Sequence, residues 1–391
     1  MFARMMPLII GLAMLAAPGA AVAQVWLPMG SGMDDAVEEL FVYDGELIAG
    51  GRFGVAGGVG ASRIASWDGA AWKPLGDGIG GSNVLALAEY DGDLIAAGGF
   101  TMAGGASAAN IARWDGESWF PLGSGVGGGG VGALTAHDGR LIVGGNFETA
   151  GGAPANGIAA WDGSSWAPLG AEPGTWSVRS LMTFEGDLLA GVTMIGEGAS
   201  VMRWDGASWT RMGDPLGTGG FDAILALTVY DGQLTAAAPG SGLSRWDGAA
   251  WETMTTGGVA TINGVVHDLV QRDSGGFLGN ELFLCGQFNS IATPTGPVSV
   301  RGLVAWAGGD RFDEPDGGIT SAFPSPLALA VYDGDIILGG GFEMAGGSSA
   351  ANIARLGRPA PAGCYADCDD SGALDFFDFL CFQNAFAAGC P

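Results

Sequence analysis

The chain has 391 residues, 48% of them hydrophobic, and a formal net charge of −26. This acidity argues against nucleic acid and anionic lipid as partners, because both are held by basic patches. The 74 glycines follow no Gly-X-Y period, which excludes collagen, and the regular apolar runs argue against disorder.

The first segment has the features of a targeting signal. Arg4 precedes the apolar run 7–20, and Ala21-Val22-Ala23 fits a cleavage site before Gln24. The run is shorter than the ~18 apolar residues of a membrane helix, and no later stretch reaches that length. We therefore expect residues 1–23 to be a cleaved signal peptide. The mature protein is then secreted or held at the cell surface, without a membrane-spanning segment.

One sequence unit recurs through residues 24–357. Each copy has an apolar run, a turn of the Asp-Gly type, a second apolar run that usually ends in Gly-Gly, and the motif Trp-Asp-Gly-x-x-Trp. The turns begin at Asp44, Asp91, Asp138, Glu185, Asp231, Gly279 and Asp333. The motif begins at Trp67, Trp114, Trp161, Trp204 and Trp246, with Trp306 and Leu356 in the equivalent places. These marks define seven copies, which calls for a repeat architecture.

Each copy predicts four short strands. In the second copy, 84–87 pairs with 94–96 across an Asp-Gly hairpin turn, an Ala-Gly-Gly loop follows, and 110–114 and 119–122 form the outer strands. Trp114 then lies opposite Trp119, and Pro121 fits an edge strand that needs no ladder donor. A four-stranded unit of about 40–50 residues is the size of a β-propeller blade.

The two ends of this region complement each other. The seventh copy stops after 352–356 and lacks its fourth strand, whereas residues 26–32 match the fourth-strand segment 119–125. The sequence therefore predicts an all-β fold, a seven-bladed β-propeller closed by an N-terminal strand. A chance partial repeat is the alternative.

The repeat phrase "GGxFxxAGGxxANxIAxWDGxxWxPLGxG" resembles kelch-type propellers. It is also similar to repeats of bacterial exported proteins and of fungal cortical polarity-marker proteins. The resemblance covers roughly residues 25 to 357 and lacks the spaced Tyr and Trp of kelch repeats. It implies a propeller used for binding and specifies no ligand.

The repeats predict no catalytic residue. His137 occupies a place held by Tyr in other copies, which favours a structural role, and His267 lies in the divergent sixth copy without a Ser or Cys partner motif. The recurring Asp residues are interpreted as turn formers, and Cys285 as a small buried hydrophobe. The copies differ most at 190–200, 235–243 and 255–320. Such asymmetry predicts either a binding site or simple decay of the repeats.

The C-terminus predicts a separate calcium module. Residues 358–363 form a linker, and the loop after it matches the EF-hand template, with Gly372 at its sharp turn. The expected Ca²⁺ ligands are Asp367, Asp369, Ser371, Ala373 (through its carbonyl), Asp375 and Asp378.

The last Asp of this loop and the helix expected at 376–386 resemble one half of a dockerin, in a tail of planctomycete type. A full dockerin has two loops, and one is present between residues 364 and 391. Four cysteines crowd into the same segment, and an oxidising compartment favours two disulfides over zinc, with three connectivities open. These are Cys364, Cys368, Cys381 and Cys390.

Together these features predict an exported, non-enzymatic binding or scaffold propeller. We expect its face to bind a protein or glycan, and its tail to attach to a cohesin-like or envelope protein through Ca²⁺. The alternative is a secreted carbohydrate-active enzyme with a dockerin tail, since dockerins often accompany such enzymes. A third interpretation is purely structural surface material.

Overall fold

The computed structural model describes residues 24–357 with short gaps. The gaps are 171–175, 195–196, 218–222, 239–241, 255–261, 274–279, 294–295, 307–311, 316 and 322–324. The expected signal peptide, linker and calcium module lie outside the described residues.

The described chain forms antiparallel sheets, each named here by its innermost strand. The β2 sheet contains β2 (Val37–Tyr43), β3 (Glu46–Gly51), β6 (Ile64–Trp67) and β7 (Trp72–Pro74). The β8 sheet contains β8 (Ile79–Tyr90), β9 (Asp93–Ala103), β11 (Ile111–Trp114) and β12 (Trp119–Pro121), with β10 (Ala106–Ser107) on β9. The β14 sheet contains β14 (Val131–His137), β15 (Arg140–Gly145), β18 (Ile158–Trp161) and β19 (Trp166–Pro168).

The remaining large sheets follow the same plan. The β20 sheet contains β20 (Trp176–Phe184), β21 (Asp187–Met194), β22 (Gly198–Trp204) and β23 (Trp209–Arg211). The β24 sheet contains β24 (Ala226–Tyr230), β25 (Gln233–Ala238), β26 (Gly242–Trp246) and β27 (Trp251–Thr253). The β28 sheet contains β28 (Ile262–Asp273), β29 (Asn280–Thr293), β31 (Leu303–Trp306) and β32 (Phe312–Asp313), with β30 (Gly296–Ser299) on β29. The β34 sheet contains β34 (Ser325–Tyr332), β35 (Asp335–Gly341), β38 (Ile353–Gly357) and β1 (Val25–Pro28).

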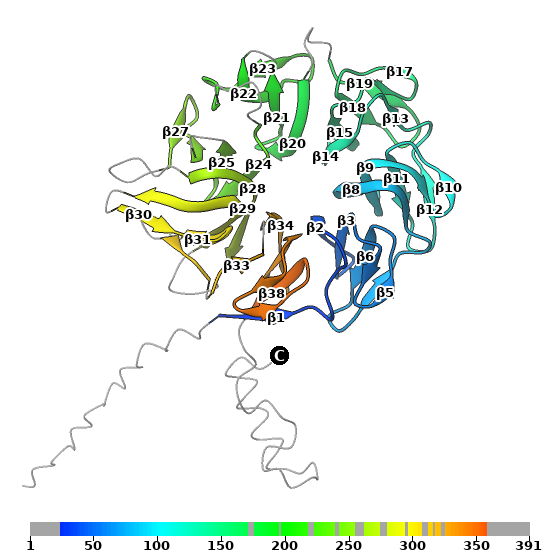
Figure 1. Ribbon diagram of the computed structural model, residues 1–391. Coiled ribbons are helices and arrows are strands. Elements are labelled where there is room, and N and C mark those ends of the chain that lie inside the picture. Colours follow the sequence, from blue (N-terminus) through cyan, green and yellow to red (C-terminus); the bar gives the residue numbers. More distant parts are fainter. Residues whose placement is uncertain are drawn as a thin grey trace, which may run out of the picture. The chain divides into compact units, whose positions relative to one another are not determined.

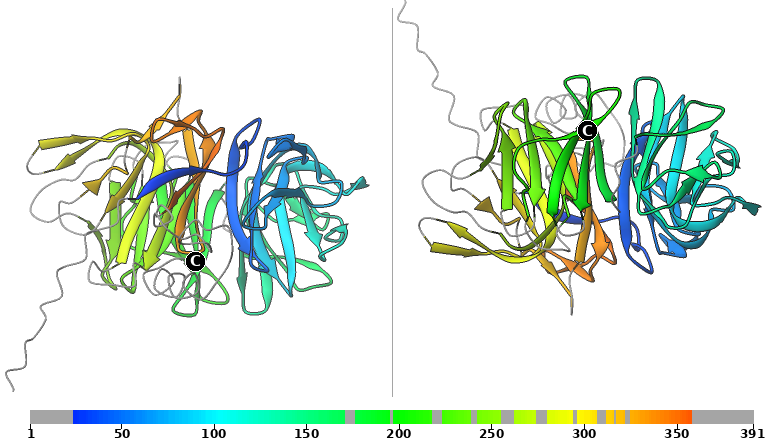
Figure 2. Two further views of the ribbon diagram at one scale, coloured as in Figure 1. Left: turned by 90° about the horizontal axis from the view of Figure 1, so that it is seen from below. Right: turned by 90° about the horizontal axis from the view of Figure 1, so that it is seen from above.

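These sheets are arranged as a ring (Figure 1). Each innermost strand contacts the innermost strand of the next sheet, in the order β2, β8, β14, β20, β24, β28 and β34, and β34 contacts β2. Figure 2 views the ring from two sides and shows the strands of neighbouring sheets crossing its thickness. The hydrophobic core lies between adjacent sheets, because each cluster of buried side chains draws on two neighbours.

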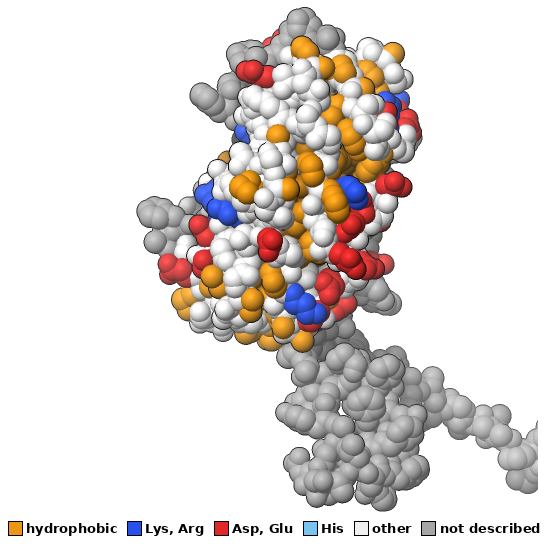
Figure 3. Space-filling model, turned by 90° about the vertical axis from the view of Figure 1, so that its right-hand side faces the viewer, with side chains coloured by type: hydrophobic (Ala, Val, Ile, Leu, Met, Phe, Trp, Pro, Cys, Tyr) orange, Lys and Arg blue, Asp and Glu red, His pale blue; other side chains and the backbone are white. Residues whose placement is uncertain are grey.

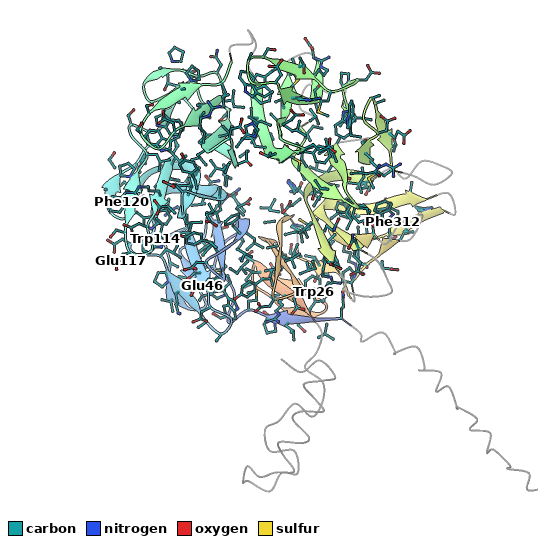
Figure 4. The ribbon with its side chains drawn as sticks, turned by 180° about the vertical axis from the view of Figure 1, so that it is seen from behind. Trp26, Glu46, Trp114, Glu117, Phe120 and Phe312 are labelled. Carbon is teal, nitrogen blue, oxygen red and sulfur yellow. The ribbon has the colours of Figure 1, made fainter. Side chains whose placement is uncertain are left out.

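The N-terminal strand completes the last sheet, as the sequence predicts. β1 pairs antiparallel with β38, with Trp26 opposite Leu356, and forms the outer edge of the β34 sheet. Figure 4 shows Trp26 at this edge, beside strands from the other end of the described chain. A second tie spans the same junction, where the Tyr332 hydroxyl donates to the Gly45 carbonyl at 3.3 Å. The ring is therefore closed by contacts between residues far apart in sequence.

The outer strands confirm the tryptophan pairing. Trp114 lies opposite Trp119 with ring centroids 5.3 Å apart, and the indole N–H of Trp119 donates to the Leu75 carbonyl of the preceding sheet at 2.9 Å. Pro121 lies on the edge strand β12. The motif thus stabilises its own hairpin and the contact between sheets.

The Gly-Gly pair has a packing explanation. A Cβ on Gly50 would lie 2.6 Å from Val84 Cγ1 of the next sheet, and a Cβ on Gly51 would lie 2.2 Å from the Ala36 carbonyl oxygen. Real Cβ atoms do not approach so closely. Gly51 therefore needs glycine, because backbone atoms block a side chain, whereas a side chain at Gly50 would require Val84 to shift. The equivalent contact of Gly339 with Val37, at 2.6 Å, packs the last sheet against the first.

The Ala-Gly-Gly segment is more ordered than a simple loop, which corrects the expectation. In the β8 sheet it is a tight turn between the end of β9 and β10, because Gly104 (φ +56°) and Gly105 (φ +78°) supply the left-handed conformations. The same segment elsewhere gives three short sheets. These comprise β4 (Val55–Ala56) and β5 (Val59–Gly60); β13 (Val126–Gly127), β16 (Thr149–Ala150) and β17 (Ala153–Pro154); and β33 (Ile319–Thr320), β36 (Met344–Ala345) and β37 (Ser348–Ser349).

The outer flank of the β8 and β14 sheets is mixed in character. Figure 3 shows a band of hydrophobic side chains on this face, with acidic side chains gathered along one edge. Phe120 and Met102 are among the exposed large hydrophobic residues of the molecule. Among the described residues, no helix is long and apolar enough to cross a membrane.

Candidate functional site

The candidate site is built from β-bulges in the innermost strands. In six of these strands the pairing with the second strand skips one residue, which lies two residues before a Leu. The skipped residues are Glu38, Leu85, Gly132, Arg179, His267 and Leu327. A bulge bends its strand and re-aims the side chains beside it. All six residues border one central cavity.

The cavity has a volume of about 330 Å³ and is bordered by the innermost segment of each sheet named above. Most of its wall is Leu, Ala or Gly. The ionisable residues on the wall are Glu38, Glu39, Arg179, His267 and Asp268. The charge is unevenly distributed, because the carboxylates come from β2 and β28, which flank β34, whereas the arginine comes from β20.

Glu38 is already neutralised by its neighbours. Its Oε1 accepts a hydrogen bond from Arg52 Nε at 2.7 Å, and its Oε2 accepts one from Asn83 Nδ2 at 2.6 Å. The side chain is 6% exposed. Glu38 therefore ties the β2 and β8 sheets together and has little capacity left for a ligand.

Asp268 connects two sheets while remaining on the cavity wall. Its Oδ1 accepts the Leu269 amide and its Oδ2 accepts the Leu329 amide of β34, both at 2.7 Å. Burial nevertheless raises the pKa of this carboxyl to about 7, outweighing the two amides that lower it. The group is thus poised between its charged and neutral forms near neutral pH.

Glu39 and His267 complete the acidic side of the cavity. Burial, and then the nearby Asp268 charge, raise the pKa of Glu39 well above its usual range. Burial lowers the pKa of His267, which keeps the imidazole neutral, and its Nε2 is buried without a hydrogen-bond partner in the described part of the chain. Perturbed groups of this kind gathered in a cavity are typical of functional sites.

Arg179 stands across the ring from these groups. It occupies the bulge of β20 and is exposed, and within the described ranges its side chain makes no ion pair or hydrogen bond. A guanidinium in this position can bind a carboxylate through two parallel hydrogen bonds.

The recurring acidic residues have the structural role predicted for them. Asp162 Oδ1 accepts the amides of Ser164 and Ser165, each at 2.8 Å, and these bonds hold the pKa of its carboxyl well below the usual range. The hairpin residue Asp91 adopts φ 54°, as such a turn requires. These aspartates shape turns and lie apart from the cavity wall.

The structure also places the other residues singled out in the sequence. His137 is buried, and its Nδ1 lies 3.1 Å from Thr183 Oγ1 of the next sheet, which confirms a structural role. Cys285 is fully buried, as expected. The Ca²⁺ ligands predicted between Asp367 and Asp378 lie outside the described residues. Within the described ranges, no group of three His, Cys, Asp or Glu side chains is arranged to hold a metal ion.

Sequence reasoning found only part of the cavity wall. His267 and Asp268 lie in the divergent stretch 255–320, whereas the stretches 190–200 and 235–243 contribute no wall residue and Glu38, Glu39 and Arg179 were not singled out. The signal was nevertheless available in the repeats. The residue directly after the bulge is Ala86, Ala133 and Ala328 in three copies, and Ala226 holds the equivalent place in β24. It is Glu39 in the first copy and Asp268 in the sixth, so charge interrupts a column of alanines.

Comparisons with known proteins agree on the fold. Residues 137–159 and 333–357 match the family model of a domain of unknown function, the DUF5122 β-propeller. The comparison with curated proteins gives no significant match. Among solved structures, the extracellular domain of BT4673 from B. thetaiotaomicron, described as a one component system, has a TM-score of 0.55 at 9% identity. That likeness covers 85% of this chain and 40% of that chain, so the chain spans about two fifths of its length.

Two further solved structures are similar over nearly their whole length. YCF48 bound to D1 peptide has a TM-score of 0.53 at 13% identity and covers 88% of this chain and 99% of that chain. The WD40 β-propeller domain of Doa1 has a TM-score of 0.51 at 17% identity and covers 85% of this chain and 96% of that chain. Likeness at such identities shows the fold alone. Together with the ring of sheets, it defines this chain as a β-propeller.

Proposed function

We propose that this protein is an exported, non-enzymatic binding propeller of seven blades, which takes a ligand in its central cavity. Its C-terminal segment would attach it to a cohesin-like or envelope protein through Ca²⁺. The observation that carries the proposal is the cavity wall, where charged residues replace the alanine and leucine of the other repeats. Repeats that served only to build a ring would have no need of charge at its centre.

The blade count is supported by the order of the inner strands. Each of the sheets named above supplies one strand to the ring, and β34 returns to β2. The contribution of β1 to the β34 sheet accounts for the repeat that is split between the two ends. The kelch-like character rests on the repeat phrase alone.

Export is supported by the signal-like segment 1–23 and by the kind of protein that shares the fold. The extracellular domains of BT4673 and BT3049 from B. thetaiotaomicron have TM-scores of 0.55 and 0.56. A binding role is in keeping with YCF48, whose structure was solved with a peptide bound. The tail adds attachment, because its EF-hand-like loop resembles half a dockerin.

A carbohydrate-active enzyme is the second candidate, and the raised pKa values of Glu39 and Asp268 favour it. Glycoside hydrolysis uses two carboxyl groups, one of them kept protonated near neutral pH. The position of Asp268 weighs against this role, because both of its oxygens accept backbone amides and it bridges two sheets. A general acid needs an oxygen directed at its substrate.

The proposal is tested on the mature chain, residues 24–391. Envelope proteins of the producing organism are captured on immobilised protein with and without a calcium chelator, using wild type and Asp367→Ala. Capture that is lost with either treatment supports attachment through the tail. In parallel, the wild-type protein and Asp268→Asn are assayed for hydrolysis of polysaccharides. Hydrolysis by the wild type that is lost in Asp268→Asn would overturn the non-enzymatic assignment. Capture that persists in both treatments would overturn the role of the tail.

A further inference from the structure

We propose that the cavity binds a small zwitterion, a free amino acid or a short peptide, with its ammonium group at Glu39 and Asp268 and its carboxylate at Arg179. This inference rests on the proposed binding function and specifies its ligand class. It follows from the charges on the wall, from the absence of an ion-pair partner for Glu39 and Arg179 among the described residues, and from the separation of these groups around the ring.

The acidic side of the cavity lacks a cation. Glu39 makes no hydrogen bond or ion pair with another described residue, and it is close enough to Asp268 for the two charges to repel each other. Two carboxylates in a partly buried place are unfavourable unless a proton or a positive charge compensates them, and a bound ammonium group would supply that charge. Arg52 does not supply it, because its guanidinium is bound to Glu38. The buried His267 Nε2 adds an unused polar atom on the same side.

The opposite side of the cavity lacks an anion. Arg179 projects from the β20 bulge, and none of the described residues forms an ion pair with it. Its guanidinium remains charged at any pH the protein meets, and its planar fork of donors matches a carboxylate. Arg52 and Arg113, by contrast, form ion pairs with Glu38 and Asp93.

The order of the strands separates the two sides. β24 lies between β20 and β28, and β8 and β14 lie between β20 and β2, whereas β34 alone separates β2 from β28. Leu85, Leu134 and Leu227 line the intervening wall. A metal ion would compensate the charge only on the acidic side of the cavity. A zwitterion would compensate the charges on both sides and place its apolar part against the leucines.

The size of the cavity limits the ligand. A volume of about 330 Å³ is at the small end of the range for ligand pockets, which suits a small molecule. A folded domain or an internal segment of a polypeptide would also lack the free termini that the charges require. The inference is therefore restricted to compounds that carry both a free ammonium and a free carboxylate.

The test is calorimetric titration of the mature chain, residues 24–391, with L-alanine, dialanine and trialanine, and with trialanine that is N-acetylated or C-amidated. We expect saturable binding of at least one free zwitterion and a loss of about tenfold or more in affinity on blocking either end. The three free probes distinguish an amino acid from a peptide. Equal affinity of free and blocked trialanine would overturn the inference, as would the failure of all three free probes to bind.

Protein variants assign each end of the ligand to its side. Glu39→Gln should weaken binding of the free peptide about tenfold and leave binding of the N-acetylated peptide unchanged. Arg179→Gln should also weaken binding of the free peptide about tenfold, but leave binding of the C-amidated peptide unchanged. Glu117→Gln, on the outer rim (Figure 4), is the matched control and should bind as wild type does. Each variant is first checked for an unchanged thermal midpoint.

Failure of this inference is distinguishable from failure of the proposed function. Putrescine, a diamine without a carboxylate, serves as the comparison probe. If putrescine binds as tightly as trialanine and Glu39→Gln abolishes both, the zwitterion is wrong while a binding cavity stands. If neither binds, the zwitterion is again wrong, and the envelope capture experiment decides the function independently.

Discussion

Replacing Asp268 with asparagine should make the protein less sensitive to alkaline pH. The carboxyl of Asp268 has a pKa of about 7 in the folded protein, against 3.8 in a model compound, because burial disfavours its charge. A group whose pKa rises on folding binds its proton more tightly in the folded state. The stability of the protein therefore falls as pH rises from the unfolded value to the folded one.

The size of the effect follows from the shift. The window from 3.8 to about 7 corresponds to roughly 4 kcal/mol in the free energy of unfolding, of which roughly 2–3 kcal/mol falls between about pH 5 and about pH 8. Asparagine resembles the protonated acid and still offers one oxygen to the Leu269 or Leu329 amide. Near pH 5 the variant should lie within about 1–3 kcal/mol of wild type, the cost of one lost acceptor.

Urea unfolding monitored by tryptophan fluorescence at about pH 5 and about pH 8 measures the prediction, and the difference between the two pH values is the informative quantity. It should shrink in Asp268→Asn and stay unchanged in Asp91→Asn, which alters an exposed turn residue for which asparagine is equally suited. If the pH dependence of the two variants is the same, the carboxyl of Asp268 is ionised in the folded protein without cost, and the reasoning is refuted.

Three further predictions concern the ring and the tail. Gly51→Ala should lower the free energy of unfolding by about 1–3 kcal/mol or more, since its Cβ would lie 2.2 Å from the Ala36 carbonyl oxygen. Gly60→Ala is the control, because open space surrounds this position, and it should lower the free energy of unfolding far less in the same urea titration. Trp26→Ala should lower the free energy of unfolding by about 3–5 kcal/mol and make β1 accessible to protease. Trp26→Phe should keep the ring closed. Equal cleavage of both variants would contradict the closure argument. Calcium titrated into the mature chain should bind saturably and lose that binding in Asp367→Ala, and a wild-type protein that binds none would exclude the loop as a calcium site.

Much of the fold could be predicted from the sequence because its determinants are local and repeated. An Asp-Gly turn between apolar runs specifies a hairpin wherever it occurs, and the missing fourth strand pointed directly to the segment around Trp26. The Ala-Gly-Gly turn was underestimated. Whether such a segment forms a loop or a short hairpin depends on what it packs against, and Gly104 packs against Trp119, a contact made only in the folded sheet.

The site was less predictable because it depends on positions from different repeats. Glu39, Arg179 and Asp268 are far apart in sequence, and none belongs to a catalytic or metal-binding motif. Their meeting follows from the ring order of the inner strands and from the bulges that bring neighbouring side chains to the cavity. A comparison of equivalent positions in the repeats could have found the charged residues that replace Ala or Leu. It could not have shown that these charged residues border one cavity.

The bulge also explains why a ligand site would arise at this place in a repeat ring. Before the bulge the inner strand is constrained, since Val37 packs against Gly339 and a Cβ on Gly51 of β3 would clash with the Ala36 carbonyl oxygen. The bulge residue itself has no partner in the ladder, and its neighbour faces the cavity, so both can change without breaking a pair between strands. A ring that must keep its repeats alike to close can therefore differ from copy to copy at its centre. There, charged side chains such as those of Glu39 and Arg179 border the cavity and disturb the packing between the sheets least.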